Sequence, residues 1–116
     1  MSELKFTFRH LGINSDDPAM EAETASLFSE IFGLETRKLP RSTMAGPSIE
    51  IMEHANKGRH GHIAFTVSSI PEALALLESK GWQSNDEGSF RKEDGSYRLI
   101  YLTKEIAGFA IHLFED

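Results

Sequence analysis

Three histidines and one glutamate lie among apolar neighbours, and they are the residues of this chain best suited to chemistry. His10 belongs to RHLGINS, Glu50 to SIEIME, His62 to GHIAFTVS and His112 to AIHLFE. Neutral imidazoles together with a carboxylate are ligands that suit divalent transition metals such as Zn, Ni, Mn or Fe. The chain has no cysteine. Any transition-metal site must therefore use histidine and carboxylate ligands.

An internal repeat places these residues at corresponding positions in two halves of the chain. RHLGINS at 9–15 is echoed by GHIAFTVS at 61–68, and a helical pattern begins eight residues after each histidine, at Pro18 and at Ile70. The fragments around Glu50 and His112 also match, since each alternates apolar residues and ends in glutamate. We therefore expect two related modules.

The first predicted helix begins at Pro18, with Asp17 as its N-cap, and ends at Gly33. Proline fits the first helical position because it lacks the backbone N–H that would otherwise be unpaired there. One face of this helix is apolar, which predicts that the helix packs on a sheet. The face is formed by Ala25, Phe28, Ile31 and Phe32.

The second predicted helix begins after Ser69, which forms a capping box with Glu72, and Gly81 is expected to end it. Its apolar residues recur at helical spacing and form a second face to bury. They are Ile70, Ala73, Leu74 and Leu77.

Short strand-like stretches follow each helix and complete two β-α-β-β-β modules. The stretches are 36–39, 42–45, 48–53, 89–92, 97–102 and 109–115. The modules span about 4–53 and 61–116, and a polar segment at 54–60 joins them. We predict one domain over 1–116 of the α+β class, because a half of about 55 residues is marginally stable alone. Its two βαβββ modules form a curved mixed sheet with helices on the outer face.

Side chains alternate across a strand, and this alternation predicts which face carries the four candidate residues. Ile63, Phe65 and Val67 suit the face under a helix, so His62 lies on the other face. The same argument places His10, Glu50 and His112 on the uncovered face, which becomes a cup if the sheet curls. We predict a metal site there. A solvated sheet face without a ligand accommodates the same four residues.

Composition excludes several classes of function. The 116 residues are too few for a (β/α)8 barrel, and 40% of them are apolar, so a core can form. A net charge of −6 has the wrong sign for a general nucleic-acid binder. The chain has no apolar signal core and no run near the roughly 18 residues of a membrane span. We expect a soluble cytoplasmic protein with neither nucleic-acid nor membrane partners.

At these residues the sequence resembles the vicinal oxygen chelate superfamily, which includes glyoxalase I, bleomycin-resistance proteins, methylmalonyl-CoA epimerase and extradiol dioxygenases. RHLGIN, SIEIME, GHIAFTVS and AIHLFE stand where that superfamily places its four ligand strands. The likeness is closest to the glyoxalase-like domain attached to some 2-keto-3-deoxy-6-phosphogluconate aldolases, on GHIAF and IYLTKEIAGFAIHLFE. It implies metal ligation by His10, Glu50, His62 and His112, but it transfers no aldolase chemistry, because the Schiff-base lysine belongs to a barrel that this chain lacks.

The chain departs from glyoxalase I at His112, where that enzyme and many relatives have glutamate. Glu115 lies three residues further on and on the opposite face, so it is a poor substitute. The expected enzyme is a divalent-metal-dependent lyase or isomerase on a small hydroxy- or keto-acid, with Glu50 as base. Dioxygenase chemistry is also compatible with a three-His, one-Glu set.

Two other hypotheses about the function stay open. The cup could bind a small ligand without turnover, with aromatic residues lining it; the candidates are Trp82, Phe90, Tyr97 and Tyr101. The chain could also be an accessory domain of a sugar-acid aldolase system. Cations expected near the rim, each of which also fits an ordinary solvated surface, are Arg9, Arg37, Lys38, Arg41, Lys57, Arg59 and Arg98. The resemblance also implies a homodimer.

Overall fold

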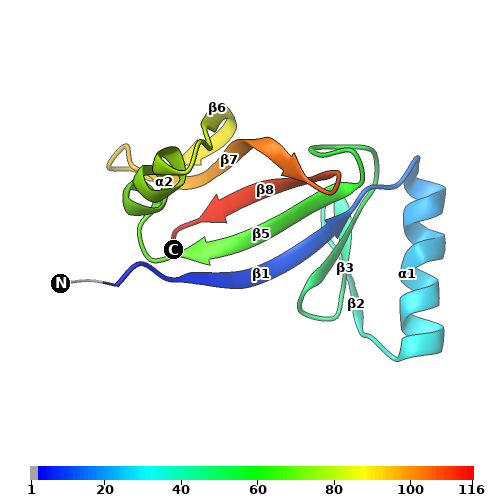
Figure 1. Cartoon of the computed structure of the whole chain (residues 1–116). Helices are drawn as coiled ribbons and strands as arrows, with labels where there is room; N and C mark the ends of the chain where they lie inside the picture. Colours follow the sequence, from blue (N-terminus) through cyan, green and yellow to red (C-terminus); the bar gives the residue numbers. More distant parts are fainter. Residues whose placement is uncertain (1–2) are drawn as a thin grey trace.

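The computed structural model describes residues 3–116 and contains one continuous eight-stranded sheet with two helices. In chain order the elements are β1 (Phe6–Ile13), α1 (Pro18–Phe32), β2 (Thr36–Lys38), β3 (Ser42–Ala45), β4 (Ile49–Met52), β5 (Gly61–Val67), α2 (Ile70–Ser79), β6 (Ser84–Arg91), β7 (Tyr97–Ile106) and β8 (Phe109–Phe114). Figure 1 shows α1 and α2 at opposite ends of the long central strands. The predicted α+β fold of two βαβββ modules is confirmed.

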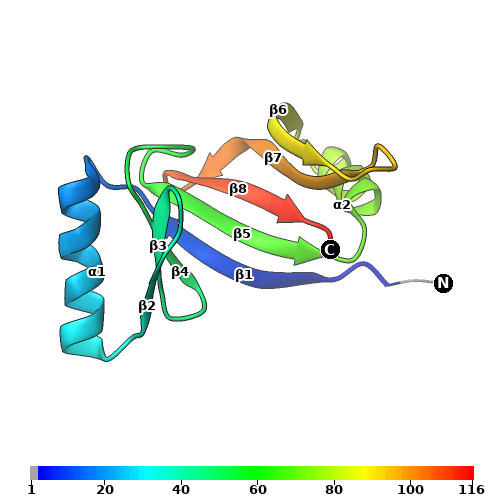
Figure 2. The same ribbon diagram turned by 180° about the vertical axis from the view of Figure 1, so that it is seen from behind.

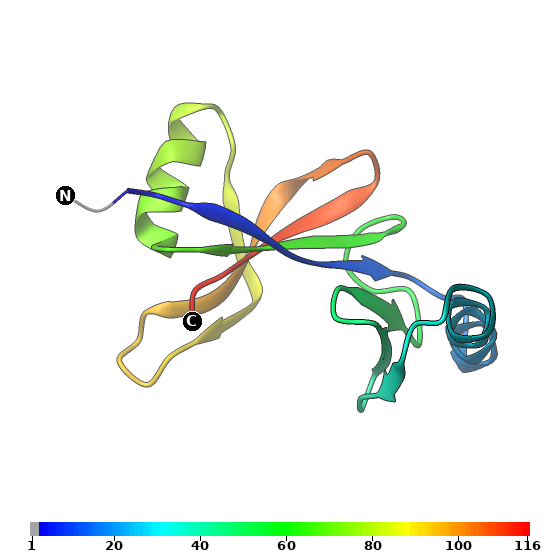
Figure 3. The ribbon, with the colours of Figure 1, turned by 90° about the horizontal axis from the view of Figure 1, so that it is seen from below.

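The strand order is β2-β3-β4-β1-β5-β8-β7-β6, so the two modules meet edge to edge at the centre of the sheet. β1 pairs parallel with β4, β5 pairs parallel with β8, and β1 and β5 pair antiparallel. Figure 2 shows β3 and β4 beside β1 from behind, and Figure 3 shows how strongly the sheet twists. The face of this sheet that the helices leave uncovered is concave, since residues of β1, β4, β5, β7 and β8 line a cavity there.

Both helices begin at the predicted caps. The Asp17 side chain accepts a hydrogen bond from the Met20 backbone N–H at 2.9 Å, and Ser69 Oγ accepts one from the Glu72 backbone N–H at 3.2 Å. These contacts satisfy backbone donors that have no partner within the helix. Gly33 ends α1 with φ 70°, a left-handed conformation that glycine adopts at little cost.

Each helix covers its own module on the face opposite the candidate residues. Ile70 and Ala73 of α2 pack with Val67, Ile111 and Leu113, all of which are buried. In the first module, Ala25 of α1 packs against Ala45 and Ile51 of the sheet. Ile51 and Ile111 therefore point away from the concave face, as alternation along the strands predicts.

The apolar face predicted for α1 is only half buried. Ala25 is buried and Phe28 packs beside it, but Ile31 is 65% exposed and Phe32 is 67% exposed. Fifteen helical residues span about 22 Å. Strands of three or four residues span only about 10–13 Å. The short strands of the first module cannot cover the last turn of a helix that long.

The second module differs from the prediction at three places. β6 begins at Ser84, five residues before the predicted start at 89. The prediction missed this part of the strand because nearly all residues of β6 are exposed, so no alternating pattern marks it in the sequence. β7 continues to Ile106 instead of ending at 102. The second helix ends at Ser79 with Lys80 as its C-cap, so Gly81, predicted as the stop, lies beyond the helix with φ 87°.

A β-bulge in β1 places Phe8 and His10 on opposite faces of the sheet. Phe8 pairs with Phe65 and His10 pairs with Ala64, so Arg9 is an extra residue of β1 that has no pairing partner in β5. Without the bulge Phe8 and His10 would share a face. With it, Phe8 joins the helix-covered face and His10 joins the concave one.

No helix of residues 3–116 is both long and apolar enough to span a membrane.

Candidate metal centre

Three of the four predicted ligands meet on the concave face of the sheet. His10 Nε2 lies 3.1 Å from His62 Nε2, while Glu50 Oε1 lies 3.4 Å from His10 Nε2 and 3.2 Å from His62 Nε2. Within residues 3–116, these are the residues whose ligand atoms cluster closely enough to hold an ion. The three atoms form a nearly equilateral triangle.

The size of the triangle fits one transition-metal ion. Two ligand atoms about 2.05 Å from a common ion are about 2.9 Å apart at a right angle and about 3.3 Å apart at a tetrahedral angle. The observed edges of 3.1 to 3.4 Å span that range. Two imidazoles and one carboxylate on a single face form a ligand set that leaves further positions open to substrate.

The pairing of β1 with β5 brings the two histidines together. His10 pairs with Ala64, and His62 pairs with Gly12, so each imidazole crosses a small residue of the other strand. A Cβ built on Gly12 would lie 2.0 Å from His62 Cε1. The His62 ring therefore occupies space that only glycine leaves free. This glycine is needed for space and not for an unusual backbone angle.

Glu50 is held as a carboxylate by its neighbours. Ser42 Oγ donates a 2.8 Å hydrogen bond to Glu50 Oε2, on the opposite side of the carboxylate from Oε1. Hydrogen bonding to His62 holds the pKa of Glu50 below its usual value, and Ser42 adds to this, against the opposing effect of burial. The group is ionised at neutral pH, the state in which a carboxylate binds a cation or accepts a proton.

The fourth predicted ligand, His112, lies in the same cavity but outside the triangle. Its ring stacks on that of His62 with centroids 4.4 Å apart and an interplanar angle of 8°, and the Tyr101 ring meets it edge-on at 3.8 Å. Burial lowers the pKa of His112 to about 2, with further lowering by His62 and His10, so the imidazole is neutral. Burial likewise lowers the pKa of His10.

The Nε2 atom of His112 is buried and makes no hydrogen bond within the described residues. A buried polar atom without a partner costs about 1–3 kcal/mol. Such an atom is uncommon unless it serves a purpose, and a neutral imidazole beside a cluster of metal-type ligands is itself a metal-type ligand. The donor set of this cavity thus fits a divalent ion, while ligation by His112 stays a prediction.

The cavity above these residues measures about 230 Å³. Its remaining lining is largely apolar: Met52, Asn56, Leu99, Tyr101 and Phe114. Met52 and Phe114 each follow a candidate ligand by two residues, so alternation alone places them on the same face. The contributions of Gly12, Ser42 and Leu99 depend on the pairing between strands, which no local sequence pattern reports.

Other residues singled out in the sequence lie elsewhere. Of the four aromatic candidates only Tyr101 lines the cavity, since Trp82 packs in the α2 core and Phe90 is 64% exposed. Lys38 is an ion-pair partner of the buried Glu21 of α1, at 3.0 Å. Arg9 lies over the Phe114 ring, 4.1 Å from its centroid, and also pairs with Asp116.

Glu115 has a structural position away from the candidate ligands. Its Oε1 accepts a 2.6 Å hydrogen bond from the Ile70 backbone N–H at the start of α2, and its Oε2 pairs with Lys92 Nζ at 2.9 Å. Both contacts, that to Lys92 first, hold the pKa of Glu115 below its usual value. Its distance from the site agrees with the sequence argument that it cannot replace a glutamate at 112.

Comparison with solved structures identifies the fold. The chain is similar to methylmalonyl-CoA epimerase in complex with methylmalonyl-CoA and NH4+, at 20% identity and a TM-score of 0.64, over 95% of this chain and 94% of that one. It is also similar to the Mycobacterium tuberculosis epimerase, at 18% identity and a TM-score of 0.63, over 94% and 87% of the two chains. A hypothetical protein from Bacillus halodurans matches at 19% identity and a TM-score of 0.65, over 97% and 95%.

No protein-family model matches the sequence, and no curated protein matches it. At such low identities the structural matches show that this chain shares the fold of methylmalonyl-CoA epimerase, and no more. An activity can therefore be proposed only from the geometry of the site itself.

Proposed function

We propose that this protein is a divalent-metal-dependent isomerase or lyase that removes a proton from the carbon next to a carbonyl or carboxylate of a small acid. The observation that carries the proposal is the triangle of His10 Nε2, His62 Nε2 and Glu50 Oε1, with edges of 3.1 to 3.4 Å, at the base of a small cavity. A divalent ion of the Zn, Ni, Mn or Fe type is the proposed cofactor, and His112 is the proposed fourth ligand.

The roles of the residues follow from their contacts. When bound, the ion supplies Lewis acidity for two neighbouring substrate oxygens, which favours loss of the adjacent proton. Glu50 would act as the base by loosening Oε1 from the ion and taking up the proton there, while Ser42 continues to hold Oε2 in place. Leu99 and Phe114 form apolar walls that exclude water from the reacting carbon.

The substrate is small. A cavity of about 230 Å³ is below the usual range of about 300–1,000 Å³ for sites that enclose drug-sized ligands. The volume suits a hydroxy- or keto-acid, including a sugar acid of the kind handled by the aldolases whose attached glyoxalase-like domain the sequence resembles. The CoA portion of an ester like that bound by the solved epimerase would have to lie outside the cavity.

The test is hydrogen exchange at carbon. Metal-free protein is reloaded with each ion in turn and incubated in deuterated water with a panel of 2-hydroxy acids, 2-keto acids and methylmalonyl-CoA, and exchange is followed by proton NMR. We expect metal-dependent exchange that Glu50→Gln slows at least about 100-fold, because a general base contributes about 10²–10⁴-fold.

Glu53→Gln is the matched control, because Glu53 lies three residues further on and outside the ligand cluster. It should exchange at the wild-type rate. Elemental analysis must show that Glu50→Gln still holds metal. Metal-dependent binding of a small acid with no exchange for any member of the panel would contradict catalysis and favour a binding module instead.

A second candidate activity is an oxygenase. Two histidines and one carboxylate on one face are the ligand set of non-haem Fe(II) oxygenases, and the triangle matches that description. Oxygen uptake by Fe(II)-loaded protein with a substrate of the panel distinguishes the two activities. Uptake that other ions do not support would favour the oxygenase.

We also propose that the chain forms a homodimer. Support comes from apolar side chains that a single chain leaves in water, among them Ile31 and Phe32 on α1 and Phe8 on β1, each more than half exposed. Light scattering coupled to size-exclusion chromatography measures the mass directly, and a mass of one chain would contradict the proposal.

A further inference from the structure

Lys57 is a cation without a carboxylate partner at the edge of the metal cavity. It belongs to the segment between β4 and β5, next to Asn56, which lines the cavity. The Lys57 Nζ lies 5.2 Å from the centroid of the Tyr101 ring, and Tyr101 lines the same cavity. Within residues 3–116, Lys57 forms no ion pair, whereas Lys38 and Lys92 both do.

The Lys57 side chain is fixed between two surfaces. One surface is the Tyr101 ring, and the other is the backbone of Gly88 in β6. A Cβ built on Gly88 would lie 3.3 Å from Lys57 Cε and 3.3 Å from Tyr101 Cε2. The glycine therefore allows β6 to approach both side chains closely, and the ammonium group is confined near the Tyr101 face.

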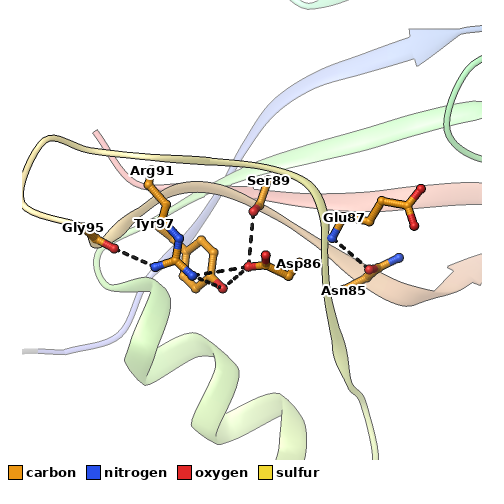
Figure 4. A network of polar contacts seen from close by, with 7 residues as sticks. All are labelled: Asn85, Asp86, Glu87, Ser89, Arg91, Gly95 and Tyr97. Carbon is orange, nitrogen blue, oxygen red and sulfur yellow. Dashed lines mark hydrogen bonds and ion pairs between the residues drawn. The ribbon is translucent and has the colours of Figure 1, made fainter.

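The part of β6 that contacts Lys57 is itself held by polar contacts. Residues 86–89 lie where the pairing of β6 with β7 is interrupted. There Asp86 accepts hydrogen bonds from Tyr97, Ser89 and Arg91, and the Arg91 guanidinium stacks over the Tyr97 ring at 4.0 Å (Figure 4). This network fixes the irregular stretch of β6 against β7, so that Gly88 stays beside Lys57.

The connecting segment is fixed as well. Asn14 Nδ2 donates a 3.0 Å hydrogen bond to the Gly58 carbonyl, and the His60 N–H donates one of 2.8 Å to the Gly108 carbonyl. Gly58 has φ 82°, and a Cβ there would lie 1.9 Å from the Gly61 carbonyl oxygen. The residue that follows Lys57 is thus hydrogen-bonded and packed too closely to accept a side chain, which limits the movement of Lys57 and Asn56.

We propose that Lys57, with Asn56 beside it, binds a carboxylate or phosphate group that the substrate carries beyond the two oxygens facing the metal centre. The inference rests on the proposed function and narrows its substrates to acids with a second anionic group. An unpaired ammonium group beside a partly enclosed cavity attracts such a group, and the Asn56 amide can donate a hydrogen bond to it. The electrostatic effect of Lys57 on His112 supports its closeness to the cavity.

The experiment compares chelating probes that share one metal-binding head and differ in the group that they carry beyond it. Acetohydroxamate presents two neighbouring oxygens to a metal and has no other charged group. N-hydroxysuccinamate has the same head with a distal carboxylate, and 3-phosphonopropanohydroxamate has a distal phosphonate. Zinc-loaded protein is titrated with each probe by calorimetry. We expect the better of the two charged probes to bind about five- to tenfold more tightly than acetohydroxamate, and its identity shows whether carboxylate or phosphate is preferred.

The variants assign this preference to Lys57. Lys57→Gln should lose the preference and keep the affinity for acetohydroxamate, which also shows that the variant is folded and metal-loaded. Lys57→Arg should keep most of the preference. Lys104→Gln is the matched control. Lys104 Nζ also lies over an aromatic ring, 5.5 Å from the centroid of Trp82, but neither residue lines the cavity. It should bind all three probes as the wild type does.

Two results would overturn the inference alone: no preference for a charged probe in the wild type, or a preference that survives Lys57→Gln. Loss of the preference in Arg41→Gln with retention in Lys57→Gln would also overturn it, by assigning the anion to Arg41 in the neighbouring hollow that Met52 and Asn56 also line. Failure of acetohydroxamate itself to bind the zinc-loaded wild type would contradict the proposed function.

Discussion

The two modules share one backbone frame and use it for different chemistry. In the first, Gly12 pairs with Glu50, Met44 with Glu50 from the other side, and Ser42 with Met52. The corresponding pairs in the second are Ala64 with His112, Tyr101 with His112, and Leu99 with Phe114. His10 and His62 stand two residues before Gly12 and Ala64. The frame is therefore symmetric position by position.

The side chains on this frame are not symmetric. The first module supplies a carboxylate supported by the Ser42 hydroxyl, whereas the second supplies an imidazole packed against the Tyr101 ring and beside the apolar Leu99. The first module therefore carries the negative charge of the site, and the second provides a neutral imidazole and an apolar wall. The duplication thus explains why four ligand-type residues converge, and the differences explain what the cavity can do.

The largest effect is expected at Gly12, which corresponds to Ala64 of the second module and lacks its methyl group. Gly12→Ala places a Cβ within 2.0 Å of the His62 ring, which must move. Displacement of one ligand by about 1 Å should weaken zinc binding at least about 100-fold, measured by competition with a chelator. The opposite exchange, Ala64→Gly, removes atoms and should change zinc affinity less than threefold. Equal zinc affinities for the two variants would contradict the assigned position of His62.

A smaller effect is expected from the residues that support Glu50 and His112. Ser42→Ala removes the hydrogen bond to Glu50 Oε2 and should weaken zinc binding about tenfold, as loss of a group that orients a ligand commonly does. Leu99→Ala, at the corresponding position, should instead lower the free energy of unfolding by about 2 kcal/mol and leave zinc affinity nearly unchanged. Chelator competition and urea unfolding measure the two quantities, and similar effects on zinc affinity would contradict the division between the modules.

The smallest effect is expected at the two glutamates that directly follow the corresponding strands β4 and β8, Glu53 and Glu115. Glu115→Gln should lower the free energy of unfolding by about 1 kcal/mol at pH 7, because the carboxylate at the start of α2 is replaced by a neutral group. The pKa of Glu115 is depressed in the folded protein, so its contribution is complete above the unfolded pKa of about 4.3 and is lost as pH falls through the folded value.

The difference between wild type and Glu115→Gln should therefore disappear in acid, as measured by urea unfolding across pH. Glu53 is the corresponding residue of the first module, and its side chain makes no hydrogen bond or ion pair within residues 3–116. Glu53→Gln should leave stability unchanged at every pH. A pH-independent loss in Glu115→Gln would assign the effect to packing instead of charge.

The repeat, the capping residues and the alternation of side chains were sufficient to predict the module order, both helix N-caps and the face that carries the candidate ligands. They work because each depends on residues near one another in sequence. Contacts between strands are different: the proximity of His62 to Gly12, and the support of Glu50 by Ser42, depend on register. The bulge at Arg9, which places Phe8 on the face opposite His10, has no local sequence signal either.

The exposed parts of the fold were the hardest to predict. β6 has no alternating pattern because water lies on both sides of most of its residues. The last turn of α1 looks like a buried face in the sequence, but Ile31 and Phe32 extend beyond the short strands beneath them. Periodicity reports which residues could be buried and does not report how much sheet is available to bury them.

The most direct test of the metal centre is the ion content of the protein after equilibrium dialysis against zinc, measured by elemental analysis. We expect about one ion per chain for the wild type and for His54→Ala, whose histidine is exposed in the connecting segment, and almost none for His62→Ala. A wild type without zinc, or a His62→Ala protein that holds as much zinc as the wild type, would contradict this expectation.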